Sequence, residues 1–116
     1  MLQLTPQTPV YVAVEHQDFR KGIDGLAQVC RQHLDHDPFS GAIFVFRNRR
    51  GTAIKCLCFD GQGFWLCLKR FSKDKLAWWP KGRTPHTLTH RDLQILLWNG
   101  NPEVVELSAD WRRVSY

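Results

Sequence analysis

The spacing of apolar residues divides the chain into short elements of both secondary-structure types. The run VYVAVE (10–15) is β-branched and aromatic, and it predicts a strand. Apolar residues then recur with helical spacing over 23–34, which predicts a helix. A second helix is predicted over 89–98, with Thr89 as its N-cap and Gly100 as its stop signal.

Between the two predicted helices lie three apolar runs that are joined by short connectors. The runs are AIFVF (42–46), AIKCLCF (53–59) and FWLCLKRF (64–71), and the connectors RNRRGT and DGQG both contain glycine. Such runs predict an antiparallel meander, and the unbroken apolar character of the middle run predicts that both of its faces are covered. The segment 72–87 is polar and punctuated by proline and glycine, which predicts an irregular connector.

The predicted order is β-α-β-β-β-loop-α, an α+β fold with about four strands and two helices. A chain of 116 residues, 43% of them apolar, can bury one modest core, so we expect a single domain over 1–116. No run is long enough to cross a bilayer, and MLQLTPQTPV lacks the pattern of a secretory signal. We therefore expect a cytoplasmic protein whose four cysteines are thiols rather than disulfides.

Positive charge is concentrated in the middle of the chain. The formal net charge is +5, but residues 47–83 hold ten basic and only two acidic side chains. This asymmetry predicts a basic pole, which typically meets phosphate or an acidic partner, although a solvated basic surface is the simpler alternative. Arg47, Arg49 and Arg50 crowd the connector after the second predicted strand, and arginine binds phosphate through a planar fork of donors.

Trp78 and Trp79 and the cysteines allow more than one interpretation. Exposed tryptophans stack on bases, whereas buried ones would form a minor core. A DGQG loop that closes residue 59 against 64 would place Cys56 opposite Cys67, with Cys58 on the same face. Three such thiols and a histidine could bind zinc, but CLC lacks the usual ligand spacing, so core thiols without a metal are favoured.

A nuclease interpretation would use the carboxylates together with a lysine. Carboxylates can hold Mg²⁺ and polarise a phosphodiester. Turns and caps account for Asp18, Asp24 and Asp60 equally well, and Asp37 precedes a proline. We therefore expect a protein that is not an enzyme and needs no cofactor.

Several motifs occur in order between residues 18 and 80. They are DFRKGIDGL (18–26), DPFSG (37–41), FVFRNRRGTAIK (44–55), DGQG (60–63), KR (69–70) and WP (79–80). In these motifs the chain resembles the TnpB-type accessory protein that is encoded by the second reading frame of insertion sequences of family sixty-six. That name is shared with an unrelated RNA-guided nuclease. The resemblance covers about 10–98, departs from the family at SKDKLAWWP (72–80), and leaves the tail 99–116 unmatched.

The resemblance implies a role in DNA transposition beside a separate, larger transposase, and it assigns no catalytic residues. We hypothesise that a basic face clamps the phosphates of transposon-end DNA, which positions the protein without reading sequence. Arg20 and Lys21 would contribute near a helix N-terminus, where backbone N–H groups favour phosphate. The other candidates are Arg47, Arg49, Arg50, Lys55, Lys69, Arg70, Lys73 and Lys75. The alternative is an adaptor that docks on an acidic surface of the transposase, and whether the basic strand end joins the turn depends on strand register.

Overall fold

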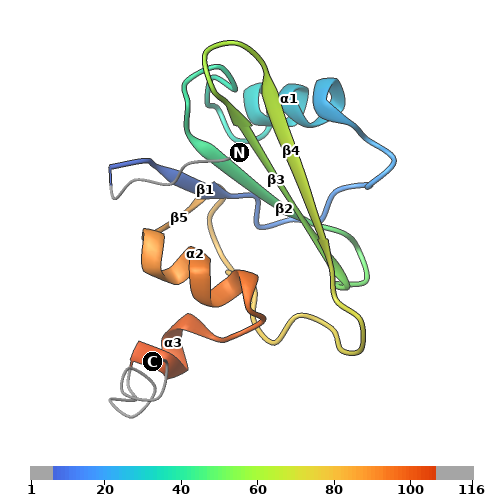
Figure 1. The fold of residues 1–116 in the computed structure, drawn as a ribbon, viewed down its shortest axis with the longest axis vertical. Coiled ribbons are helices and arrows are strands. Elements are labelled where there is room, and N and C mark those ends of the chain that lie inside the picture. The colour runs from blue at the N-terminus through green and yellow to red at the C-terminus, as the bar shows by residue number, and fades with distance from the viewer. Residues whose placement is uncertain (1–6, 107–116) are drawn as a thin grey trace.

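A five-stranded mixed sheet lies between helices in the computed structural model, which describes residues 7–106 (Figure 1). Its order is β4-β3-β2-β1-β5. The strands are β1 (Val10–Val12), β2 (Ile43–Arg47), β3 (Ala53–Phe59), β4 (Phe64–Arg70) and β5 (His86–Leu88). The helices are α1 (Ile23–Gln32), α2 (His90–Leu97) and α3 (Pro102–Glu106). The predicted α+β class is confirmed.

Strands β2, β3 and β4 form the predicted antiparallel meander. Phe59 lies opposite Phe64 across the DGQG loop, as its length predicted. The sheet as a whole is mixed, because β1 runs parallel to β2 and α1 forms the crossover between them. The first strand ends at Val12 rather than at residue 15, although the Ala13 amide still donates to the Val45 carbonyl of β2 at 3.0 Å.

Two elements were missed in the sequence. Strand β5 overlaps the end of the segment 72–87 that was predicted to be irregular, and it pairs antiparallel with β1. It has only three residues, too few for an alternating pattern, so its pairing with β1 defines it. Helix α3 lies in the tail, of which 107–116 are outside the described residues.

The two predicted helices are confirmed with slightly shorter bounds. Helix α1 turns one apolar face, made of Leu26, Ala27, Val29 and Cys30, into the core. Helix α2 begins at the predicted N-cap, where the Thr89 hydroxyl accepts a hydrogen bond of 3.0 Å from the Asp92 amide. No helix in the described part of the chain is long and apolar enough to span a membrane.

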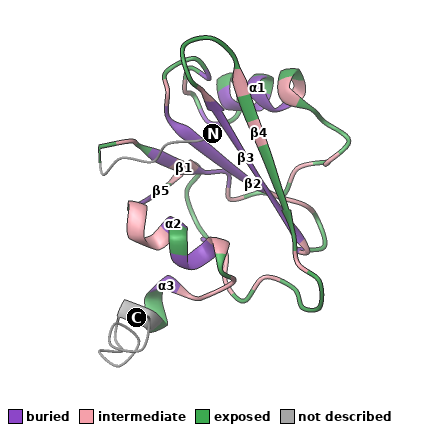
Figure 2. Ribbon diagram, in the orientation of Figure 1, coloured by how far each residue is buried: buried purple, intermediate pink, exposed green. Residues whose placement is uncertain are grey.

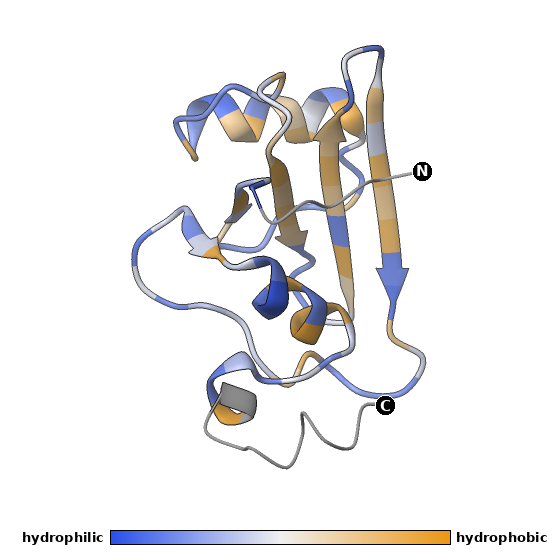
Figure 3. Ribbon diagram, turned by 60° about the vertical axis from the view of Figure 1, so that its left-hand side comes forward, coloured by the Kyte–Doolittle hydropathy of each residue, from blue (hydrophilic) through white to orange (hydrophobic). Residues whose placement is uncertain are grey.

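The core has two layers, one on each face of the sheet. Val12, Val45 and Ile54 face α2, whereas Phe44, Phe46 and Leu57 face α1. All residues of β3 before Phe59 are buried, which confirms that both faces of the middle strand are covered (Figure 2). Strand β4 is mostly exposed at the edge of the sheet, yet most of its length is apolar (Figure 3).

Candidate nucleic-acid interface

The turn between β2 and β3 is held rigidly by Asn48. Its side-chain oxygen accepts hydrogen bonds from the amides of Thr52 (2.8 Å) and Ala53 (3.2 Å), and its amide nitrogen donates to the Thr52 hydroxyl at 2.8 Å. Gly51 adopts a φ of +70°, a conformation that glycine tolerates without strain. The side chains at the tip therefore project from a fixed backbone.

The three arginines of this turn have different environments. Arg47 is half-buried, and its guanidinium donates to the carbonyls of Asn48 (3.1 Å) and Arg49 (3.3 Å). The same guanidinium lies 6.0 Å from the ring centre of Trp79, within the range of a cation–π contact. Arg49 and Arg50 are exposed, so these two side chains present their charge to solvent. Arg47 instead stabilises the turn through its hydrogen bonds to the turn carbonyls.

The segment after β4 is fastened to this turn and to the end of α2. The Leu76 amide donates to the Gly51 carbonyl at 2.7 Å. Asn99 accepts a hydrogen bond of 2.8 Å from the Ala77 amide and donates one of 3.2 Å to the Lys75 carbonyl. The part of this segment that precedes β5 is thus irregular, as predicted, but it is held in place on two sides.

Trp78 and Trp79 pack against the core on the α2 side of the sheet. The Trp79 indole N–H donates to the carbonyls of Ala13 (3.2 Å) and Val14 (3.1 Å), which follow β1 directly. The Trp78 ring meets the His86 ring edge to face, with 6.3 Å between centres. Both side chains are half-buried, so each contributes to the minor core and still reaches a cleft.

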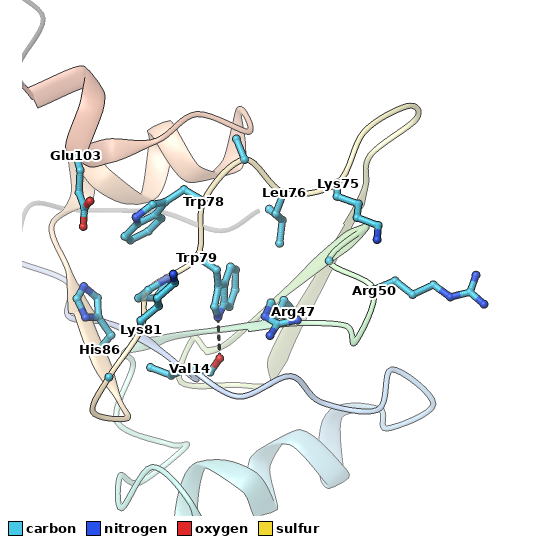
Figure 4. Close-up of a pocket in the computed structure, with 14 residues that line it drawn as sticks. Val14, Arg47, Arg50, Lys75, Leu76, Trp78, Trp79, Lys81, His86 and Glu103 are labelled. Carbon is cyan, nitrogen blue, oxygen red and sulfur yellow. Dashed lines mark hydrogen bonds between the residues drawn. The ribbon is translucent and has the colours of Figure 1, made fainter.

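A cleft of about 720 Å³ lies between the β2–β3 turn, the 75–82 segment and α3 (Figure 4). Trp78 and Trp79 form its apolar wall. In Figure 4 the Arg50 side chain extends outward from the turn, away from Arg47 and the indoles. Positive charge predominates in the cleft, because the charged residues that line the cleft are Arg47, Arg50, Lys75, Lys81 and Glu103.

Strand register brings Lys69 into line with the turn. Ile54 pairs with Arg47 on one side and with Lys69 on the other, so the two cations lie on the same face of three adjacent strands. The Lys69 ammonium donates to the Leu97 carbonyl at the end of α2 and lies 5.6 Å from the ring centre of Phe71. Arg70 pairs with Ala53 and faces the opposite side, so the two candidate phosphate contacts of β4 are divided between the two faces of the sheet.

Lys55 has a structural environment that the sequence hypothesis did not anticipate. It is the buried charged residue of β3, on the α1 face, with 9% of its surface exposed. Its ammonium donates to the carbonyls of Phe19 (2.9 Å) and Lys21 (3.0 Å) and lies 4.9 Å from the Phe19 ring centre. Lys55 therefore fastens the segment before α1 to the sheet, and its buried ammonium is not available to a phosphate on the surface.

Arg20 and Lys21 also lie away from the cleft, because Lys55 holds their segment on the α1 side. Arg20 forms an ion pair with Asp18, with 2.6 Å between the closest atoms, and this hydrogen bonding lowers the pKa of the Asp18 carboxyl to about 2. The Lys21 ammonium donates to the Gln17 side chain at 3.2 Å. Lys73 and Lys75 are exposed on the pinned segment, and only Lys75 reaches the cleft.

The cysteines lie where the loop length predicted. Cys56 pairs with Cys67, and Cys58 faces the same side of the sheet. Burial raises the pKa of the Cys56 thiol to about 12, which keeps it protonated. Across 7–106, no group of three or more histidine, cysteine or acidic residues is placed to hold a metal ion.

The carboxylates that a nuclease would need serve local structure. Asp60 accepts hydrogen bonds from the amides of Gln62 (2.9 Å) and Gly63 (3.0 Å) and from the Trp65 indole (2.8 Å), which together lower its pKa. Asp37 accepts a 2.9 Å hydrogen bond from the Phe39 amide in the DPFSG turn. Both carboxylates are accounted for by turn chemistry.

Sequence reasoning missed Lys81, His86 and Glu103 as lining residues of the cleft. Lys81 was counted in the basic segment, and its position directly after WWP was the one signal that could have identified it. Glu103 lies in the tail, and only the packing of α3 beside α2 brings it to the cleft.

Comparisons with known proteins give one family and two similar proteins. A family model described as IS66 Orf2 like protein matches residues 8–105, and so extends beyond the limit of residue 98 suggested by the motifs. The uncharacterized protein y4jC of Sinorhizobium fredii is 37% identical over 105 residues, which cover 90% of this chain and 82% of the relative. The uncharacterized protein y4hO of the same bacterium is 36% identical over 78 residues, which cover 67% of this chain and 68% of the relative. No solved structure matches the chain significantly.

Proposed function

Because this chain belongs to the family of IS66 Orf2 like proteins, which implies a transposition-associated accessory role, we propose that it grips the phosphate backbone of transposon-end DNA at the basic cleft and assists a separate transposase. Arg49, Arg50, Lys75 and Lys81 make the phosphate contacts. No catalytic step is assigned to the protein.

The observation that carries this proposal is that the arginines of one rigid turn have two different environments. One arginine is hydrogen-bonded within the turn, and the other two are exposed to solvent. Arg47 is committed to the turn carbonyls and to Trp79, whereas Arg49 and Arg50 are exposed on a backbone that Asn48 holds in place. A rigid backbone lowers the entropy that is lost when long side chains bind phosphate. Lys75 and Lys81 extend the positive charge around the cleft.

Trp78 and Trp79 form an aromatic surface in the cleft on which a nucleic-acid base can stack. Trp79 is fixed by two hydrogen bonds to the carbonyls of Ala13 and Val14, directly after β1, and Trp78 packs against His86. Stacking of an unpaired base on such rings tolerates any sequence. Together with phosphate contacts, this favours a protein that positions DNA and leaves sequence choice to its partner.

The test is binding of the purified protein to fluorescently labelled transposon-end and scrambled duplexes across a salt series. The Arg49→Ala, Arg50→Ala double variant should weaken binding to both duplexes similarly. The slope of log affinity against log salt should fall by roughly 0.9 for each phosphate that the variant no longer binds. The matched control removes Arg20 and Arg31, two arginines on the α1 side of the molecule, and should change the slope less.

Equal losses of affinity in the two variants would show that net charge alone matters and would refute a localised site. Absence of DNA binding by the folded wild-type protein would refute phosphate binding altogether. The exposed arginines would then be assigned to an acidic surface of the transposase, and the transposase would replace the duplex as the binding partner to be tested.

A further inference from the structure

Strand β4 ends the sheet, and no described element pairs with its outer side (Figure 1). Two backbone hydrogen bonds bracket its pairing with β3: Asp60 donates to the Gly63 carbonyl at 3.0 Å, and Phe71 donates to the Thr52 carbonyl at 2.9 Å. Antiparallel strands alternate between inward and outward bonding positions. The backbone groups that point outward therefore belong to Phe64, Leu66, Leu68 and Arg70.

This edge is also unusually apolar. Leu68 is 61% exposed and Trp65 is 38% exposed, and Cys67 between them is exposed as well. Native proteins protect such edges with charges, prolines or bulges, because an open edge is a template for another strand. In β4 the only charges are Lys69 and Arg70, which lie together at its end.

The side chains of β4, whose sequence is FWLCLKR, are complementary to those of a second, antiparallel copy of β4 that is centred on the same residue, Cys67. A two-fold axis through Cys67 places Leu66 of one copy opposite Leu68 of the other. The same axis places the two aromatic residues opposite the two cations of the second copy, a pairing that favours cation–π contacts. All seven residues of the strand then have partners, and no like charges meet.

Registers that are shifted toward the two cations are worse for identifiable reasons. An axis through Leu68 would place Lys69 opposite Cys67 and leave both aromatic residues beyond the partner strand. An axis through Lys69 would oppose the lysine to itself, which is destabilising. With the axis at Cys67, as with any axis through a residue of β4, the outward-bonding residues of the two copies meet each other, so the side-chain pairs decide between these registers.

We propose that two copies of this chain associate through antiparallel pairing of their β4 strands, which extends the sheet continuously from one copy into the other. The axis is perpendicular to the sheet, so both basic clefts lie on the same face of the joined sheet, toward its opposite ends. Leu66 and Leu68 of the two copies form a four-leucine cluster on the α1 face.

The central cysteine pair provides a direct probe of this register. Cys67 occupies a position on the outer edge where antiparallel partners do not share hydrogen bonds, and there the Cα atoms lie about 4.5 Å apart. A disulfide spans about 4.4–6.8 Å between Cα atoms, so a mild oxidant such as diamide, which accepts the two thiol hydrogens, should link the two copies. Cys56, the cross-strand neighbour of Cys67, is buried and cannot reach a second copy.

The experiment measures molar mass by light scattering during size-exclusion chromatography without DNA, over a range of protein concentrations. The wild type should show the mass of two chains and dissociate on dilution. Leu68→Lys places a charge opposite Leu66 of the other copy and should weaken self-association by roughly tenfold or more. Val104→Lys is the matched control, because Val104 is 60% exposed on α3, and it should associate as the wild type does.

Diamide should produce a linked dimer of the wild type whose cross-link maps to Cys67, and both Cys67→Ser and Leu68→Lys should abolish it. Cys67→Ser should nevertheless retain the mass of two chains in solution. A wild type with the mass of one chain at every concentration would overturn the proposal, and so would a Leu68→Lys variant that associates as strongly as the wild type. Since no DNA is present, either result is independent of the phosphate-binding proposal.

Discussion

Replacing Lys55 with methionine distinguishes a lysine that binds DNA from one that holds the fold together. The sequence hypothesis placed Lys55 among the phosphate contacts, whereas its ammonium is buried on the α1 face and donates to two backbone carbonyls. Methionine keeps the unbranched, apolar part of the side chain and removes the charge. The carbonyls of Phe19 and Lys21 then have no donor.

The size of the effect follows from these two hydrogen bonds. A hydrogen bond from a charged donor contributes about 1.5–3 kcal/mol, and carbonyls left without a donor add a further cost. The desolvation penalty of a buried ammonium, several kcal/mol, disappears with the substitution and offsets much of this loss. We expect the free energy of unfolding to fall by roughly 2 kcal/mol, equivalent to about 10 °C in the midpoint of thermal unfolding.

The assay is urea unfolding followed by tryptophan fluorescence, in parallel with DNA binding across a salt series. Lys75→Met is the matched control, because Lys75 is exposed beside the cleft and should affect binding rather than stability. Lys55→Met should lower stability and leave the salt slope unchanged. The reasoning is refuted if Lys55→Met is as stable as the wild type, or if its salt slope falls as far as that of Lys75→Met.

Two further predictions concern titratable groups. Thiol reagents should modify exposed Cys67 well before Cys30 and Cys56, because burial raises the pKa of each of these two thiols to about 12. The rates are measured by mass spectrometry, and equal rates for the three cysteines would contradict the burial of Cys30 and Cys56. Asp18 should titrate at about pH 2 in the folded protein, against 3.8 ordinarily, so its contribution to stability is complete above pH 3.8 and is lost as pH falls through about 2. The Arg20→Gln substitution should return the pKa of the Asp18 carboxyl toward 3.8. If the Asp18 titration followed by NMR is unchanged in this variant, the ion pair is not the cause of the lowered pKa.

Local patterns in the sequence identified most of the elements because they depend on neighbouring residues. The helical spacing that gave α1, the N-cap that gave Thr89, and the DGQG loop that set Cys56 opposite Cys67 are all encoded within a few positions of the chain. The glycine-containing turn that carries the three arginines belongs to the same class. These features needed no knowledge of what lies across the sheet.

The environment of each cation was decided by contacts between distant segments. Lys55 and Arg49 look alike in the sequence, but Lys55 points into the α1 layer and meets carbonyls about 35 positions earlier in the chain, whereas Arg49 points to solvent. Similarly, β5 is a strand because β1 accepts it as a partner, and Glu103 reaches the cleft because α3 packs beside α2.

The sequence by itself therefore determined the order of the principal elements, the basic character of the middle segment and the family to which the chain belongs. Only the tertiary structure decided which basic residues face solvent, which face of the sheet each occupies, and that β4 is the open edge. The physical reason is that periodicity encodes which side chains share a face, whereas burial and pairing depend on which distant segment arrives at that face.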